Sequence, residues 1–473
     1  MSSATDVPPA STVDPDAVGV LRSSLRGELI VPSDAGYDDA RAVWNGMIDK
    51  RPALIARCAG VADVVAAVAF ARDHQLPLAV RGGGHNVSGV AVCNDGLVVD
   101  LSSMRSVRVD RAAGTVRAEG GVTIGELDRE TQVFGLAVPM GVVTETGIAG
   151  LTLGGGLGWL RRKYGLSCDN LVSVDVVTAD GRVVTADADR EPELFWGVQG
   201  GGGNFGVVTS FEFRAHPVGP DVFLAFVVHA GTDAADALRF YGQWAALAPD
   251  EISAFAVLWH APALDEIPAA HHGKPIVVYL AMHCGDPATG EAAVRSLRAA
   301  GNPIADLSDT MPYLDVQKLF DEDYPAHTMR YYWKSQYLRA LDDEVIDVMV
   351  ALNEASPSPH STIDLWQLGG ALARRSPGDS AFGDRSAALM VGIESNWENP
   401  ADDEKAVEWG RRVHRALQPY GTGAEYTNFP GFYEDNQRTV RDTFGPNLDR
   451  LVALKQRFDP ANLFRLNQNI GPD

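Results

Sequence analysis

The sequence has little cysteine and no long apolar run. Its 473 residues include four cysteines, Cys58, Cys93, Cys168 and Cys284, which are far apart and show no C-x-x-C spacing. This distribution argues against a zinc site, and a chain of this length does not need disulfides to fold. No apolar segment is long enough to cross a bilayer. We therefore expect no metal site and no membrane-spanning segment.

Positive charge is also scarce. Lys and Arg number 40 against 62 Asp and Glu, which gives a formal net charge of −22. Such a surface repels phosphate backbones and anionic lipids, so we expect neither nucleic acid nor a membrane as partner. The first sixteen residues are mostly Ser, Pro, Asp and Ala and lack the basic start and apolar segment of a signal peptide. We expect a flexible tail over residues 1–38 and a cytoplasmic protein.

Glycine, in contrast, is abundant, and its first cluster follows a short apolar segment, 78–80. This cluster reads Arg81-Gly82-Gly83-Gly84-His85-Asn86. Consecutive glycines let backbone N–H groups approach an anion such as phosphate, and Arg81 could add a charge-assisted hydrogen bond. His85 would then lie beside the turn as nucleophile, ligand or base. Taken alone, a simple glycine turn with a buried histidine would be the preferred interpretation.

Two further glycine-rich segments follow. The segment 141–170 combines many glycines with Leu, Ile and Trp, a pattern that favours buried backbone lying flat against a large planar ligand. Farther along, Gly201, Gly203 and Gly206 satisfy G-x-G-x-x-G. A Rossmann site needs a helix after this motif, whereas the alternating, β-branched segment 207–213 predicts a strand. The sequence therefore indicates a nucleotide-binding fold of another kind.

The remaining patterns predict an α+β chain with two lobes. The opening reads as strand–helix–strand over 52–57, 60–75 and 78–80, and Asp180-Gly181 indicates a hairpin over 172–185. From about residue 220, alternating strands and helices predict a second α+β lobe on an antiparallel sheet. Its expected elements are 222–229, 234–247, 252–260, 275–283, 289–300, 341–352, 361–368 and 387–393.

The end of the chain is again dense in polar motifs. Tyr426-Thr427-Asn428 is followed by a predicted helix over 447–458 and by the asparagine-rich segment 464–470. These asparagines could close onto a polar heteroaromatic ligand. On their own they fit a capped terminal helix with turn asparagines just as well.

Taken in this order, the motifs resemble those of the vanillyl-alcohol-oxidase, or PCMH-type, FAD flavoproteins, and within them the berberine-bridge-enzyme-like oxidases. The resemblance covers about residues 39–470, and its specific parts are 81–86, 147–170, 203–206, 426–428 and 464–470. It implies a two-lobed PCMH-type FAD-binding domain over 39–219 and an α+β substrate domain on an antiparallel sheet over 220–420. A C-terminal berberine-bridge-like segment, 421–473, would return to the FAD domain.

The resemblance also implies the cofactor and its attachment. FAD would be bound covalently through His85 to the flavin 8α-methyl group. Many relatives form a second link through a cysteine, but Val143 takes that place here, and Cys168 lies in a different motif position. We therefore expect a single linkage. A covalent flavin commonly has a raised potential, which favours removal of hydride from poor donors.

The residues that the resemblance assigns to FAD come from the three glycine segments and from the chain end. They are Arg81, Gly82, Gly83, Gly84, His85, Asn86, Ser88, Gly141, Thr146, Gly147, Gly150, Thr152, Gly154, Gly155, Gly158, Tyr164, Gly165, Asp169, Gly206, Val208, Tyr426, Asn428, Asn467 and Asn469.

Catalysis by such an enzyme needs a base beside the cofactor. Tyr426 matches the family's catalytic tyrosine, and Glu394 is a second candidate. A free phenol has a pKa of about 10, so Tyr426 would need a nearby positive charge or hydrogen bond. Tyr164 is a third candidate catalytic residue, which the resemblance places along the pocket near the isoalloxazine. Trp366 and Gln367 are expected to line the substrate side.

The predicted activity is an FAD-dependent oxidase that removes hydride from a C–H beside an alcohol or amine of a small molecule or natural product and passes the electrons to O2. Two alternatives remain open. One is a flavin dehydrogenase with another acceptor, and the other is a drug-binding or resistance flavoprotein. We expect a monomer or a homodimer.

Overall fold

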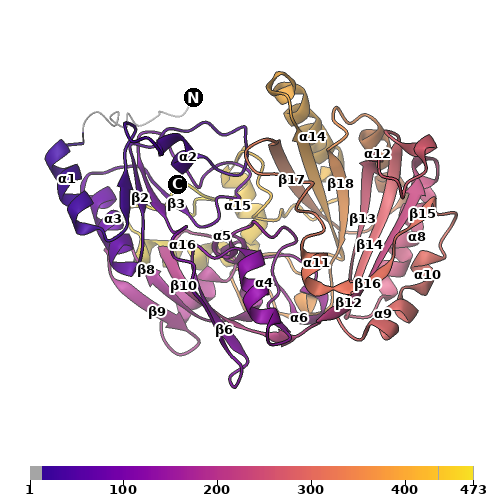
Figure 1. Ribbon diagram of the computed structural model, residues 1–473, viewed down its shortest axis with the longest axis horizontal. Helices are drawn as coiled ribbons and strands as arrows, with labels where there is room; N and C mark the ends of the chain where they lie inside the picture. Colours follow the sequence, from indigo (N-terminus) through magenta and orange to yellow (C-terminus); the bar gives the residue numbers. More distant parts are fainter. Residues whose placement is uncertain (1–12, 435, 472–473) are drawn as a thin grey trace.

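The computed structural model describes residues 13–434 and 436–471 and shows two lobes joined along one seam (Figure 1). The first lobe holds two smaller sheets, and the second holds one large sheet. The last helices, α15 (Asn436–Phe444) and α16 (Leu448–Phe458), return to the first lobe. This arrangement confirms the predicted α+β fold class.

A four-stranded sheet opens the first lobe, in the order β1-β2-β4-β3. Strands β2, β4 and β3 are parallel, and β1 joins β2 in the antiparallel sense. Helix α3 (Val61–Asp73) connects β2 to β3 and buries Val64, Ala67, Val68 and Ala71, the spacing of one helix face. The predicted strand–helix–strand unit is confirmed. The strands are β1 (Glu28–Ile30), β2 (Leu54–Arg57), β3 (Leu78–Arg81) and β4 (Leu97–Asp100).

The N-terminal segment belongs to this lobe, so the prediction of a flexible tail over 1–38 is wrong for its described part. Helix α1 (Pro15–Ser24) buries Leu21, and β1 pairs with β2. Asp14 caps α1 by accepting a hydrogen bond from the Asp16 backbone N–H, and Pro15 suits the first helical position. The short helix α2 (Tyr37–Arg41) follows. Residues 1–12 of the predicted tail lie outside the described residues.

The second sheet of this lobe is antiparallel and has the order β5-β6-β10-β8-β9. Strands β8 and β9 form the predicted hairpin. Strand β10 begins directly after Gly206, which confirms that this glycine motif opens a strand and no Rossmann helix. The strands are β5 (Val107–Asp110), β6 (Thr115–Glu119), β8 (Leu171–Val177), β9 (Val183–Asp187) and β10 (Val207–Arg214). The helices are α4 (Ile124–Gln132), α5 (Ile148–Leu153), α6 (Arg161–Tyr164) and α7 (Pro192–Val198).

The second lobe is an antiparallel sheet with the order β15-β12-β14-β13-β18-β19-β17, to which β16 adds by pairing with β12. Its strands are β12 (Asp221–Ala230), β13 (Ile252–His260), β14 (Pro275–His283), β15 (Ala305–Asp306), β16 (Asp309–Pro312), β17 (Arg330–Leu338), β18 (Thr362–Gln367) and β19 (Leu389–Trp397). A small bridge between β7 (Leu136–Ala137) and β11 (His216–Pro217) precedes it in the chain.

The two faces of this sheet have different partners. Helices α8 (Ala234–Leu247), α12 (Asp343–Glu354) and α14 (Asp403–Leu417) pack on one face, where Ile363 and Leu365 are buried. Successive side chains of a strand point to opposite faces, so Asp364 and Trp366 point toward the first lobe instead. The remaining helices, α9 (Pro287–Ala293), α10 (Arg295–Arg298), α11 (Tyr313–Gln317) and α13 (Ala371–Arg374), are short.

Most predicted elements of this lobe are present, but the short elements β15, β16, α11 and α13 were not expected, and three larger differences remain. The single helix expected over 289–300 is divided into α9 and α10 at Val294. Strand β17 and helix α14 were not identified. All but the first residue of β17 are buried, so the alternation that marks a half-exposed strand is missing.

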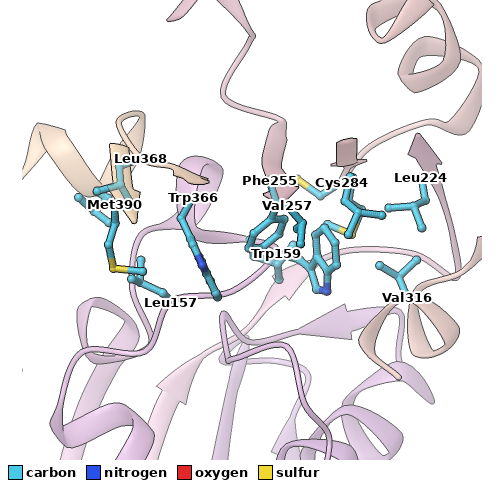
Figure 2. Packing of buried hydrophobic residues seen from close by; sticks show 14 of the residues in the cluster. Leu157, Trp159, Leu224, Phe255, Val257, Cys284, Val316, Trp366, Leu368 and Met390 are labelled. Atoms are coloured by element: carbon cyan, nitrogen blue, oxygen red, sulfur yellow. The ribbon is translucent and has the colours of Figure 1, made fainter. Parts of the chain in front are cut away.

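The seam between the lobes is largely apolar, and the buried Arg161 lies within it. Figure 2 shows Leu157 and Trp159 of the first lobe packed under Phe255 and Trp366 of the large sheet. Arg161 donates hydrogen bonds across the seam to the carbonyls of Gln367 (2.7 Å) and Ala254 (2.6 Å). Among the described residues, no helix is long and apolar enough to span a membrane.

Candidate active site

One large cavity lies between the lobes. The glycine turn, the segment 141–154 and the chain end form its first side, and the face of the large sheet that points toward the first lobe forms the other. Fifteen residues assigned to FAD by resemblance line it. They are Gly82, Gly83, Gly84, His85, Asn86, Gly141, Thr146, Gly147, Gly150, Gly154, Gly206, Val208, Tyr426, Asn428 and Asn467.

The glycine turn is fixed by contact between two backbones. A Cβ added at Gly83 would lie 2.4 Å from the Gly147 nitrogen, and one added at Gly147 would lie 2.2 Å from the Gly83 nitrogen. No side chain fits at either position, because real Cβ atoms do not approach that closely. This contact holds the turn after β3 against the loop before α5, and His85 follows at the cavity wall.

The Arg81 side chain does not face this cavity, which corrects its expected role as an anion ligand. Its guanidinium is buried and bonds to the Asp100 carboxylate, at 2.6 Å from Nη2 to Oδ2. Arg57 binds the same carboxylate, at 3.2 Å. Arg81 and Asp100 are partners in the parallel β3–β4 pair, so the ion pair joins the ends of the two strands. Arg81 therefore supports the turn from behind.

His85 is only partly exposed and is held by stacking. Its ring lies 4.0 Å from that of Trp44, which in turn stacks on Tyr331 at 3.7 Å. Burial lowers the pKa of His85 to about 3, so the imidazole is neutral at physiological pH. Its Nε2 atom is buried and has no hydrogen-bond partner among the described residues. The ring thus presents an unused nitrogen at the wall of the cavity.

The Tyr426 hydroxyl meets three donors. The backbone N–H groups of Gly156 and Leu157 each approach its oxygen to 3.1 Å, and the Asn428 amide nitrogen approaches to 2.9 Å. Burial raises the pKa of Tyr426 to about 12, and these three donors act against that shift. A neutral phenol oxygen has two lone pairs, whereas a phenolate has three. The surroundings are therefore arranged for the ionised form.

The opposite wall contains two buried carboxyl groups, Asp364 of β18 and Glu394 of β19. Tyr324 donates a hydrogen bond to Glu394 Oε2 at 2.6 Å. Burial and the neighbouring Asp364 raise the pKa of Glu394 well above its usual value. Burial also raises the pKa of Asp364, to about 7. Glu394 lies at the cavity as predicted, whereas Asp364 was not identified from the sequence.

Nine of the residues assigned to FAD do not line the cavity. The Tyr164 ring stacks on His216 at 3.9 Å, which corrects the expectation that Tyr164 lines the pocket. Asp169 binds Arg385 (2.7 Å) and Arg375 (3.1 Å), and so is part of a buried ion pair. The full set is Arg81, Ser88, Thr152, Gly155, Gly158, Tyr164, Gly165, Asp169 and Asn469.

Some of these nine have a clear structural reason for their identity. A Cβ at Gly158 would meet the Met140 carbonyl oxygen at 1.7 Å, and Gly155 has a φ of +118°. The Ser88 hydroxyl donates to Asn86 Oδ1 at 2.6 Å, and so supports a residue that does line the cavity.

On the substrate side, Trp366 lines the cavity as expected, but Gln367 does not. The Gln367 side chain points to the other face of β18, where it donates to the Ala245 carbonyl at 2.6 Å. Several cavity residues were not identified from the sequence, and Val143 was considered there only because it lacks a nucleophile. They are Val143, Phe255, Phe320, Tyr324, Trp333, Asp364 and Phe429. The alternation along β13 and β18 could have identified Phe255 and Asp364, once the inner face was known.

Comparison with known proteins agrees with this geometry. Residues 52–187 match the family model described as an FAD binding domain, and residues 425–471 match the model described as berberine and berberine like. An FAD-linked oxidoreductase of Dictyostelium discoideum is 33% identical, with 91% of each chain covered. The (R)-6-hydroxynicotine oxidase of Paenarthrobacter nicotinovorans is 31% identical, over 95% of this chain and 98% of the relative.

Solved structures agree as well. The crystal structure of 6-hydroxy-D-nicotine oxidase from Arthrobacter nicotinovorans has a TM-score of 0.85 and 30% identity, covering 95% of this chain and 99% of that chain. A chitooligosaccharide oxidase, at 23% identity and a TM-score of 0.84, covers 97% of this chain and 100% of its own and shares the fold. The chain therefore belongs to the FAD-linked oxidoreductases of the berberine-bridge-enzyme-like family.

Proposed function

We propose that the chain binds FAD in the cavity between its lobes, attaches it through His85 alone, and oxidises a small alcohol or amine with O2 as acceptor. The observation that carries this proposal is that the cavity brings together the Tyr426 hydroxyl and a neutral His85 nitrogen that has no hydrogen-bond partner within residues 13–434 and 436–471. The relatives named as oxidases, at about 30% identity, support the choice of an oxidase.

The cavity fits FAD in several respects. Consecutive glycines let the backbone lie close to the cavity. Cβ atoms added at Gly150 and Gly203 would meet no protein atom within 4 Å, so both glycines border open space. Asn467 lines the cavity, and its buried Oδ1 atom has no hydrogen-bond partner in the part of the chain that the structure describes, so it can accept a hydrogen bond from a polar ring. When bound, FAD supplies the acceptor for a hydride from the substrate.

His85 is prepared for a covalent bond by its surroundings. A nucleophile needs a free lone pair, and burial keeps the imidazole uncharged. The stack on Trp44 fixes the plane of the ring, so the unpartnered Nε2 atom has a defined direction. Val143, also on the wall, offers no second nucleophile, and burial raises the pKa of the Cys168 thiol well above its usual value.

Tyr426 is the residue best placed to take a proton from the substrate O–H or N–H. Its three hydrogen-bond donors stabilise the phenolate that a base requires. Glu394 is less suited to this role, because burial and the neighbouring Asp364 raise its pKa and so favour the protonated form, which cannot accept a proton. The same cavity could also serve a dehydrogenase, or a protein that only sequesters a ligand.

Two glycine variants test which residues hold FAD. Gly150→Ala should fold normally, because alanine favours the helix α5 by about 0.5–1 kcal/mol, yet it should weaken FAD binding by about tenfold by filling cavity space. The FAD dissociation constant is measured in a His85→Ala background, where no covalent bond can form. Gly147→Ala, the matched control, should instead lose about 1–3 kcal/mol of unfolding free energy through overpacking. Unchanged FAD affinity in Gly150→Ala would remove Gly150 from the cofactor site.

The attachment is tested by denaturing the protein. Acid-precipitated wild-type protein should keep a fluorescent flavin, and a peptide containing His85 should carry the FAD mass. His85→Ala should release the flavin on denaturation, whereas Cys168→Ala should retain it. A cysteinyl adduct at Cys168 would show that the assignment of a single His85 link is wrong.

The role of Tyr426 is tested by removing one hydroxyl. Tyr426→Phe should keep the fold and the FAD, and should slow flavin reduction by about 10²–10⁴-fold, the usual contribution of a general base. The measurement is anaerobic stopped-flow reduction by an amine or alcohol that reduces the wild-type flavin. A reduction rate equal to that of the wild type would exclude Tyr426 as the base.

The acceptor is tested by mixing the reduced enzyme with air-saturated buffer. An oxidase should be reoxidised rapidly and release one hydrogen peroxide per substrate consumed. Slow reoxidation by O2 combined with rapid reoxidation by a dye would favour the dehydrogenase. If no alcohol or amine of a broad panel bleaches the flavin, the sequestering protein is the better interpretation.

A further inference from the structure

We propose that the substrate is a cationic amine with an aromatic or apolar body, recognised by the Asp364 carboxylate, to which the neighbouring Glu394 carboxyl donates a hydrogen bond while keeping its own proton. This inference rests on the proposed function and names its substrate class. The rest of the cavity wall supplies the apolar part of the site.

The first observation is the position of Asp364. It lies in the middle of β18, paired with Val257 of β13 and Gly392 of β19, so two neighbouring strands fix its backbone. Its side chain lines the cavity, and its Oδ1 atom is buried without a hydrogen-bond partner among the described residues. Leaving a buried carboxylate oxygen unpaired costs free energy, so a ligand is the natural partner for this atom.

The second observation concerns where the proton lies. Tyr324 donates to Glu394 Oε2, and the Glu394 carboxyl donates to Asp364, a hydrogen bond that favours the charged form of Asp364. Two adjacent buried carboxyl groups cannot both ionise readily, so the pair holds one proton and one negative charge. The proton is placed on Glu394, because the hydrogen bond between the two carboxyl groups acts to raise the pKa of Glu394 and to lower that of Asp364. The negative charge therefore lies on Asp364.

The third observation is that the protein itself does not neutralise this charge. No basic side chain among the described residues contributes to the pKa shift of Asp364 or of Glu394. Arg161 lies behind the wall, where it stacks on Phe255 (4.5 Å) and bonds to backbone carbonyls. Buried charges are normally paired, so the missing cation is expected to come from the ligand.

The fourth observation is the aromatic wall around the carboxylate. Phe255, Phe320, Tyr324, Trp333, Trp366 and Phe429 line the same cavity. Phe255 and Trp366 meet edge to face at 4.5 Å, and Trp333 and Phe429 at 5.1 Å. Aromatic faces attract ammonium groups and also bury apolar surface. A carboxylate within such a wall selects a cation that carries an apolar group over a neutral alcohol or an anion.

Three probes of similar size and different charge test this inference on the flavin-containing enzyme. They are benzyltrimethylammonium, benzyl alcohol and phenylacetate. Binding is followed by the shift of the flavin absorbance and, independently, by the tryptophan fluorescence of the cavity. The cation should bind at least about tenfold more tightly than the alcohol, which corresponds to about 1.4 kcal/mol, and phenylacetate should bind most weakly.

Two isosteric variants separate the roles of the carboxyl groups. Asp364→Asn should weaken binding of the cation by about tenfold or more and change binding of benzyl alcohol by less than threefold. Glu394→Gln should keep the affinity for the cation within threefold, because its amide still donates to Asp364 and accepts from Tyr324. Circular dichroism and flavin content confirm that each variant is folded. If Asp364→Asn fails to fold, the ranking of the three probes by their affinity for the wild-type enzyme still tests the inference.

Equal wild-type affinity for the three probes would overturn the inference, as would a loss in Glu394→Gln as large as that in Asp364→Asn. These outcomes differ from failure of the proposed function. A chain that holds no flavin, or whose flavin no substrate reduces, fails the proposed function. A chain whose flavin is reduced by substrates but that shows no preference for the cation fails only this inference.

Discussion

The close contact between the Gly83 and Gly147 backbones is the constraint on which the site depends. It brings the turn after β3 against the loop before α5, and both segments then line the cavity. His85 follows the turn, so its burial on Trp44 is a consequence of this contact. A side chain at either glycine would separate the two segments and move His85 with them. The arginine that appeared to serve the ligand, Arg81, instead closes the ends of β3 and β4 through Asp100.

The sequence predicted those parts of the molecule whose signal is local. The periodicity of α3, the β8–β9 hairpin and the strand after Gly206 were all read correctly, because neighbouring residues determine them. Glycine and asparagine motifs likewise identified much of the cofactor side of the cavity. The N-terminal segment was misjudged, since its polar residues gave no sign that β1 would pair with β2. That pairing depends on a partner about 27 residues away in the chain.

The substrate side was much less predictable, for a physical reason. Asp364 and Glu394 belong to different strands, and only the pairing of β18 with β19 brings them together. An aspartate between apolar residues, as in β18, also resembles the structural acids of the chain. Asp169 is equally buried but bonds to Arg385, and Asp100 bonds to Arg81. Whether a buried carboxylate has a cation as partner can be read only from the folded structure, and this difference separates Asp364 from the other two.

The two lobes contribute different kinds of chemistry to the cavity. In the large sheet, successive side chains of a strand point to opposite faces, so the residues that line the cavity are not those that pack against the helices. The first lobe provides backbone, a neutral imidazole and, through the returning chain end, Tyr426. The second provides charge and aromatic surface from the inner face of β13, β18 and β19, while Ile363 and Leu365 on the outer face hold the helices. Because successive residues of a strand point to opposite faces, a substitution at Asp364 or Trp366 changes the cavity without touching the packing behind it. The sheet can therefore acquire a new substrate preference while the cofactor side stays the same, which is why the family resemblance identifies the cofactor and leaves the substrate to be inferred from this wall.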